Sequence, residues 1–169
     1  MDRQALRAAQ APLRETYTED PAAAWTPLHA HGDFRDDGIT CTVDGYNGAV
    51  RAGLHPATGG SGDDACSGDL LMEALVACAG VTARSVATAM GLTLGRVEVT
   101  AESHFDARGT LGIDRSVPVG IGDTTVTLRV QTELDEATAS RLATSTERYC
   151  VVGQSLRTPP TIVVVSGTP

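Results

Sequence analysis

The chain has 169 residues, a length that fits one domain with a substantial hydrophobic core. Hydrophobic residues make up 41% and charged residues 20%, which is the composition of an ordinary globular protein. The net charge is −8 and all 13 basic residues are arginines. An acidic surface disfavours nucleic acid as a partner, and the lack of lysine excludes Schiff-base chemistry and a P-loop.

The sequence predicts neither a membrane span nor a secretory signal. We expect no apolar run to approach the roughly 20 residues that a spanning helix needs, and the N-terminal stretch MDRQALRAAQAPLRETYTEDPAAAW is charged and rich in alanine. We therefore expect a cytoplasmic protein that is not bound to a membrane, in a compartment where thiols are reduced. Catalytic or redox use is then favoured over disulfides for Cys41, Cys66, Cys78 and Cys150.

The first third of the chain predicts a helix followed by a small sheet. Leu6, Ala9 and Leu13 recur at helical spacing within residues 2–18. In the strand pattern that follows this helix, Cys41 alternates with apolar neighbours, so we expect it to lie in the core. Three short strands are expected to form an antiparallel meander over residues 28–34, 38–46 and 48–54.

A long apolar helix is predicted next, over residues 68–90. After Asp69, its only charged residues are Glu73 and Arg84. A helix that is apolar nearly all round is typical of a buried central helix. Ser67 or Asp69 is suited to cap its start, and Gly91 is suited to end it in a left-handed conformation.

The remaining segments complete an α+β chain, because strands cluster in groups instead of alternating singly with helices. In the strand region over 117–134, Val126, Leu128 and Val130 alternate toward the core. The segments are a strand within 96–105, a strand region over 117–134, a helix over 135–150 and a strand over 161–165.

The residues alone leave three uses open for Cys78 and Cys150: buried packing, metal binding or a redox pair. A lone cysteine on an apolar helix face is most often packing. No CxxC or HxxxH spacing supports zinc, and His29 with His31 lacks an evident third ligand. The small residues around Cys78 allow close approach to its sulfur, which is reactive only as a thiolate.

The segments GDLLMEALVACAG, VEVTAES and ERYC together resemble the OsmC/Ohr family of peroxide-resistance proteins. The resemblance covers residues 28–166, so the whole chain, 1–169, is interpreted as one OsmC-like domain with an N-terminal helical extension, 1–27. It implies an α+β, OsmC-like fold in which antiparallel sheets wrap two central helices. It also implies an intertwined homodimer with active sites at the subunit interface.

The resemblance further implies a thiol peroxidase of organic hydroperoxides. Cys78 matches the cysteine that attacks the hydroperoxide and becomes a sulfenic acid, and Cys150 matches the cysteine that resolves it as a disulfide. An external dithiol would supply the returning electrons. No metal, flavin or haem cofactor is implied.

The resemblance also assigns two supporting residues and exposes departures. Arg35 matches the arginine that would hold the Cys78 thiolate, and Asp69 is the nearest substitute for a family glutamate, whose position is Gly68 here. Peroxidase members often carry proline after the second cysteine, where this chain has Val151. Two alternatives therefore stay open: a small-ligand binding protein that has lost the chemistry, and a redox sensor in which Cys66 pairs with Cys78.

Overall fold

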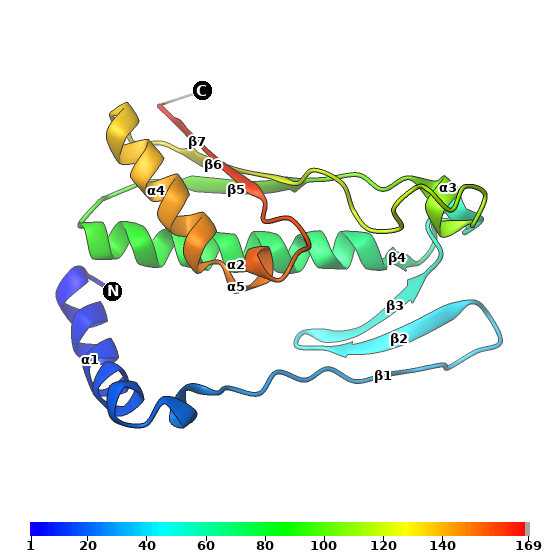
Figure 1. Cartoon of the computed structure of the whole chain (residues 1–169), viewed down its shortest axis with the longest axis horizontal. Helices are drawn as coiled ribbons and strands as arrows, with labels where there is room; N and C mark the ends of the chain where they lie inside the picture. Colours follow the sequence, from blue (N-terminus) through cyan, green and yellow to red (C-terminus); the bar gives the residue numbers. More distant parts are fainter. Residues whose placement is uncertain (168–169) are drawn as a thin grey trace.

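The computed structural model describes residues 1–167, which form a long central helix, two small sheets and an N-terminal helical arm (Figure 1). The helices are α1 (Arg3–Glu19), α2 (Ser67–Met90), α3 (Ala107–Thr110), α4 (Glu136–Tyr149) and α5 (Val151–Gln154), with 3-10 turns η1 (Pro21–Ala24) and η2 (Pro56–Thr58). The strands are β1 (Gly32–Asp33), β2 (Thr40–Gly45), β3 (Gly48–Gly53), β4 (Ala65–Cys66), β5 (Val97–Glu102), β6 (Thr125–Val130) and β7 (Thr161–Ser166). The mixture of helices and sheets confirms the predicted α+β class.

The central helix α2 follows from its apolar sequence and ends at Gly91, whose φ of 75° is left-handed as predicted. Its start differs from the prediction, because Cys66 is the N-cap residue and no side chain caps the helix. The expectation of burial all round is wrong for a single chain. One face of α2 is buried and carries Ala79, Ala83 and Ala87, which are spaced four residues apart. Val81, on another face, is 72% exposed.

By length and composition, α2 is apolar enough to cross a membrane, a criterion that core helices of soluble proteins also meet. The expectation that no segment reaches this length and hydropathy was therefore wrong. The two internal charges, Glu73 and Arg84, leave an uncharged and mainly apolar run between them. This run packs against β5 and α4, which gives α2 a structural role in the core.

The main core lies between α2, α4 and the sheet ordered β5-β6-β7. In the middle strand, Val126, Leu128 and Val130 are buried at alternate positions, which confirms the predicted inward face. Strand β5 runs antiparallel to β6, whereas β7 runs parallel to it. The sheet is therefore mixed, and the expectation of purely antiparallel sheets was wrong because α4 and α5 form a crossover between β6 and β7.

Leu128→Ala is expected to lower the free energy of unfolding by about 2–5 kcal/mol. Leu128 is fully buried in the middle strand, so truncation removes apolar contacts and leaves a cavity. Urea unfolding followed by circular dichroism measures the change. Val119→Ala is the control, because Val119 is 64% exposed and its truncation creates no cavity. Equal midpoints for the two variants would contradict this description of the core.

The second sheet is ordered β1-β2-β3-β4 and differs from the predicted meander at both edges. The strand predicted over 28–34 shrinks to Gly32–Asp33, and of the residues before it His31 adds one backbone hydrogen bond, from the N–H of Asp44 in β2. At the other edge, Ala65–Cys66 adds a short parallel strand to β3. Two residues in a Gly- and Asp-rich loop carry no periodicity that could have predicted it. Cys41 is half-buried here, not a core residue.

Two further differences concern the second half of the chain. The strand region predicted over 117–134 contains only β6, and the segment before it is a loop preceded by the short helix α3. The turn after Cys150 forms α5, which the sequence did not predict. Both α3 and α5 have only four residues, too few to show a helical repeat.

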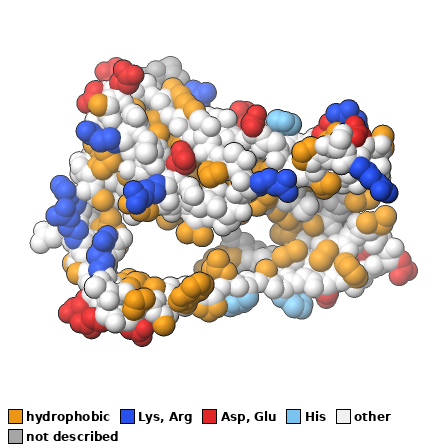
Figure 2. Space-filling view, in the orientation of Figure 1, with side chains coloured by type: hydrophobic (Ala, Val, Ile, Leu, Met, Phe, Trp, Pro, Cys, Tyr) orange, Lys and Arg blue, Asp and Glu red, His pale blue; other side chains and the backbone are white. Residues whose placement is uncertain are grey.

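The N-terminal helix forms as predicted, but as an arm with no buried residue. Figure 2 shows an opening between this arm and the rest of the molecule, bordered by hydrophobic side chains. Trp25 and Leu28, in the connector that follows the arm, are 88% and 86% exposed. Within a single chain, the arm therefore leaves large apolar side chains uncovered.

Candidate active site

Cys78 and Cys150 come together where α2, α4 and α5 meet. Cys78 lies in the middle of α2, and Cys150 follows α4 as the N-cap of α5, where its sulfur accepts a hydrogen bond from the N–H of Gly153 at 3.4 Å. Both belong to one hydrophobic cluster, in which Cys150 is fully buried and Cys78 is partly buried. Both are free thiols, and each shifts the pKa of the other. One thiol is thus accessible and the other is held behind it.

The surroundings shift the pKa values of the two thiols in opposite directions. Burial raises the pKa of Cys78, but hydrogen bonds from the N–H of Val152, from Cys150, from Thr82 and from the N–H of Val151 outweigh it and leave this pKa lowered. Burial dominates at Cys150 and raises its pKa, with only partial compensation from the N–H of Gly153. Cys78 is therefore the better nucleophile, because the thiolate is the reactive form.

We expect iodoacetamide to alkylate Cys78 at lower pH than Cys150. The lowered pKa of Cys78 means that its thiolate forms first as the pH rises, whereas the raised pKa and full burial of Cys150 delay reaction there. Tryptic mass spectrometry separates the two sites, because the chain has no lysine and cleavage after arginine yields peptides 52–84 and 149–157. A Cys66→Ser background removes the second cysteine of the first peptide. Alkylation of Cys150 before Cys78 would contradict the assignment.

Arg35 lies at a distance from this pair within one chain. Its Nε donates to Asp33 at 2.6 Å and its Nη2 donates to Asp44 at 2.8 Å, on the exposed side of β1 and β2. These two carboxylates raise the pKa of its guanidinium. Arg35 is not among the groups that shift the pKa of Cys78. Its role in holding the thiolate stays a prediction that requires a second copy of the chain.

Asp69 is also separated from Cys78 in the single chain. It lies exposed in the first turn of α2, nine residues before Cys78, which is about 14 Å along the helix axis. It borders a shallow groove between α2 and β5, together with Glu73 and Glu102. Asp69 and Arg35 form no ion pair with each other in the described residues. The predicted pair between them, like the role of Arg35, stays a prediction.

Nothing in residues 1–167 assembles a metal centre, since no three His, Cys, Asp or Glu side chains cluster with suitable geometry there. Of the two histidines considered as ligands, His31 pairs instead with Asp44, with 2.9 Å between Nδ1 and Oδ2. This contact joins the Arg35 ion pairs into one exposed network on the β1–β2 strands.

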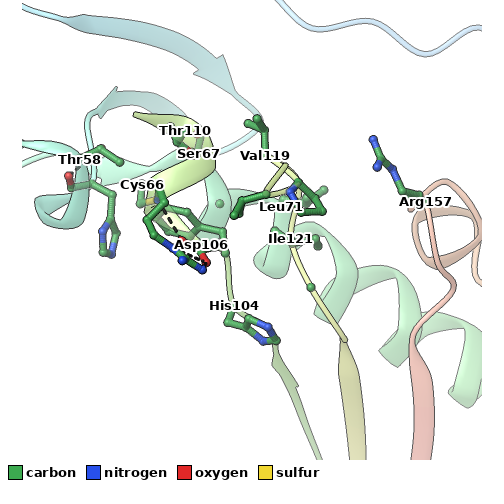
Figure 3. Close-up of a pocket in the computed structure, with 18 of the residues that line it drawn as sticks. Thr58, Cys66, Ser67, Leu71, His104, Asp106, Thr110, Val119, Ile121 and Arg157 are labelled. Carbon is green, nitrogen blue, oxygen red and sulfur yellow. Dashed lines mark hydrogen bonds and ion pairs between the residues drawn. The ribbon is translucent and has the colours of Figure 1, made fainter. Parts of the chain in front are cut away.

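A cleft of about 980 Å³ opens at the N-terminal end of α2 and was not anticipated from the sequence. Neither Cys78 nor Cys150 lines it, but Cys66 does. Figure 3 shows Leu71 of α2 facing Val119 and Ile121 of the loop before β6, with Arg157 at another edge of the cleft. The lining is mainly apolar with a few polar groups, as in many small-molecule sites.

Sequence reasoning missed three residues of the thiol site: Thr82, Val151 and Val152. Thr82 follows Cys78 by four residues on a predicted helix, so helical spacing alone could have placed its hydroxyl beside the sulfur. The backbone donors could not have been found in this way. Their position depends on the turn α5, which brings the chain after Cys150 back against α2.

Comparisons with solved structures place the fold among OsmC-like proteins. An OsmC-like protein from Mycoplasma pneumoniae matches with a TM-score of 0.68 at 13% identity, over 85% of this chain and 99% of the other. An organic hydroperoxide resistance protein from Elizabethkingia anophelis matches with a TM-score of 0.65 at 17% identity, covering 86% and 99%. An organic hydroperoxide resistance protein OsmC from Legionella pneumophila gives 0.61 and 17%, covering 85% and 100%. At these identities, the matches establish the fold.

A search of curated proteins finds no match to this chain. The family model described as OsmC-like protein matches residues 60–165, which include α2, Cys78, α4, Cys150 and most of β7. The match begins later than the residue 28 expected from the sequence, so the assignment of residues 28–59 to the same domain stays a prediction. Because the model covers well over half of its length, the chain belongs to the OsmC-like family.

Proposed function

We propose that this protein is a cysteine-based peroxidase that reduces organic hydroperoxides through Cys78. The observation that carries the proposal is the pairing of a partly exposed thiol of lowered pKa with a fully buried thiol of raised pKa. Such a pair divides the work between an attacking and a resolving cysteine. Two structural neighbours named as organic hydroperoxide resistance proteins support the same direction.

The reaction balances as a two-electron reduction of the hydroperoxide. The Cys78 thiolate attacks the terminal peroxide oxygen, the O–O bond breaks and the alcohol leaves after taking up a proton. Cys78 becomes a sulfenic acid, whose sulfur the Cys150 thiol then attacks. A Cys78–Cys150 disulfide forms and water leaves. An external dithiol gives two electrons and two protons to restore both thiols. A reducing cytoplasm would supply such a dithiol.

The proposal includes a homodimer whose interface completes the site. A single chain leaves Arg35 and Asp69 apart from Cys78, and leaves an apolar face of α2 in solvent. A second copy that covers this face could bring its own Arg35 toward Cys78. The ion pairs of Arg35 with Asp33 and Asp44 would keep that guanidinium extended along the strands.

Small-ligand binding is the second candidate function, favoured by the cleft at the start of α2. Its mainly apolar lining suits a ligand with an apolar body, and its position away from Cys78 makes it independent of the thiol chemistry. The redox-sensor alternative requires a Cys66–Cys78 disulfide, and within one chain these two residues are too far apart to form it. Cys66 and Cys78 lie 12 residues apart on one helix, or about 18 Å, too far for a disulfide within a chain.

Hydroperoxide consumption by wild type and cysteine variants tests the peroxidase proposal. The assay supplies tert-butyl hydroperoxide with dithiothreitol and measures the hydroperoxide that remains. Turnover that depends on Cys78 supports the enzyme, whereas a wild-type rate equal to the protein-free rate leaves small-ligand binding as the function to pursue.

A further inference from the structure

We propose that a second copy of this chain packs antiparallel along the exposed side of α2, where Glu73 of each chain pairs with Arg84 of the other. The pairing rests on the homodimer of the proposed function and adds the surface, the orientation and the register of that dimer. It also gives a use to the two charges that this mainly apolar helix carries after its first turn.

An exposed stripe runs along α2 through Glu73, Ala77, Val81 and Arg84. Spacings of four, four and three residues place these side chains on one side of a helix, turned away from the fully buried Ala79. All four are exposed, and Val81 is the large apolar residue among them. The stripe is therefore an uncovered apolar surface with an acid at one end and a base at the other.

Neither of these charges has an ion-pair partner among residues 1–167. Glu73 and Arg84 cannot pair with each other in one chain, because 11 residues separate them, which is about 16 Å along the helix axis. Both side chains are exposed, so each can meet an opposite charge that a second molecule supplies.

A two-fold axis would pair both charges at once. In a dimer with this symmetry, a contact from residue i to residue j is repeated from j to i. If two copies of α2 run antiparallel with the axis midway between Glu73 and Arg84, each glutamate lies opposite an arginine of the other chain. The same register sets Ala77 of one chain beside Val81 of the other, a small side chain against a larger one. A parallel pairing would set like charges side by side instead.

The surroundings of Glu73 strengthen the charge complementarity. Glu73 borders the shallow groove between α2 and β5 together with Asp69 and Glu102. In the antiparallel register, Arg84 of the second copy would enter this acidic groove, where its guanidinium can pair with a carboxylate. The same contact would form again on the other side of the axis.

Room for a second helix exists between α2 and the N-terminal arm. The opening seen in Figure 2 is bordered by hydrophobic side chains, and in Figure 1 it lies between α2 and the connector from η1 to β1. Trp25 and Leu28 of this connector are largely exposed. A second copy of α2 in this opening would touch apolar side chains on both sides, and by symmetry each connector would cover the other chain.

Charge reversal tests the pairing in the full chain. Arg84→Glu is expected to raise the dimer dissociation constant about a hundredfold, because it sets like charges opposite one another at two symmetric contacts. Glu73→Arg should raise it about tenfold or more, since Asp69 and Glu102 keep part of the groove acidic. The double variant Glu73→Arg/Arg84→Glu should return the constant to within about tenfold of wild type, because opposite charges meet again. Sedimentation velocity measures all three.

The controls make the same changes of net charge at other exposed positions. Glu133→Arg lies in the loop before α4, and Arg96→Glu lies in the turn between α2 and β5. Both controls should dimerise like the wild type. Circular dichroism checks that every variant is folded, which is expected because the substituted side chains are exposed.

Mixing the two single variants gives a result that no change inside one chain can imitate. A mixed dimer combines a chain with arginine at both positions and a chain with glutamate at both, so opposite charges meet at both contacts. At a concentration where each variant alone is a monomer, equal amounts of Glu73→Arg and Arg84→Glu should therefore form a heterodimer.

A wild-type dimer that survives both single reversals would overturn the pairing, because another surface would then hold the two chains together. Loss of the dimer that neither the double variant nor mixing repairs would overturn it as well, and so would a monomeric wild type. Hydroperoxide consumption is measured separately. A failed pairing in a protein that still turns over hydroperoxide would leave the peroxidase proposal standing, and a confirmed pairing without turnover would leave the antiparallel dimer standing.

Discussion

Cys78→Ser is expected to reduce the consumption of tert-butyl hydroperoxide by the protein with dithiothreitol to the rate without protein. The hydroxyl of serine does not ionise near neutral pH, so the variant has no thiolate to attack the hydroperoxide. Cys41→Ser is the matched control, because Cys41 is half-buried on β2 and takes no part in the pair. A Cys78→Ser variant as fast as wild type would end the peroxidase proposal.

Cys150→Ser is expected to react with hydroperoxide once, unlike Cys78→Ser, so comparing the two variants separates the roles of the two cysteines. The variant should consume about one equivalent of hydroperoxide per chain and then stall, because no second thiol lies behind Cys78 to resolve the sulfenic acid. Trapping with dimedone before mass spectrometry should mark Cys78 in peptide 52–84. Full turnover by Cys150→Ser would show that the dithiol resolves the sulfenic acid directly, contrary to the assigned role.

The sequence predicted those parts of the fold that carry a strong hydrophobic repeat. Helix α2, helix α4 and the alternating core residues of β6 lie where their periodicity placed them. In these elements the residues that the local hydrophobic pattern marks as inward-facing are the ones buried in the fold. Such agreement is the condition under which a sequence pattern predicts structure correctly. The resemblance to the OsmC/Ohr family rested on these same segments, and the family model confirms it over residues 60–165.

The parts that could not be predicted are short or depend on contacts between distant segments. Strand β4 and helix α5 have two and four residues, too few for a repeat to emerge from the noise of composition. The cleft at the start of α2 is assembled from five separate segments of the chain. The opposite pKa shifts of Cys78 and Cys150 depend on burial and on the turn α5, so spacing alone could only pair the residues.

Arg35 and Asp69 are the two predicted site residues that a single chain does not bring to Cys78. Both came from the resemblance, and in one chain each has a local structural use instead: Arg35 pairs with Asp33 and Asp44, and Asp69 lies in the acidic first turn of α2. Negative charge in the first turn stabilises a helix whatever its function. Their proposed catalytic use therefore depends on the homodimer, which makes the dimer the next claim to test.

Several exposed apolar residues lie on surfaces that we expect the proposed second copy to cover. Val81 of α2, with Trp25 and Leu28 after the arm, are all more than two thirds exposed. Figure 2 shows hydrophobic side chains around the opening between the arm and the rest of the molecule. An obligate dimer would bury roughly 2,000 Å² or more in total. Filling this opening with a second α2 would remove these apolar side chains from water.

Val81→Asp is expected to convert the protein from a dimer to a folded monomer at micromolar concentration. Val81 is 72% exposed in one chain, so the substitution should change the stability of the monomer by no more than about 0.5 kcal/mol. In an interface, the same carboxylate would be buried without a partner and would raise the dissociation constant about a hundredfold or more. Sedimentation velocity measures the change, with Val119→Asp as the control on a loop valine that is 64% exposed. A wild-type protein that sediments as a folded monomer would remove the dimer, and with it the proposed approach of Arg35 to Cys78.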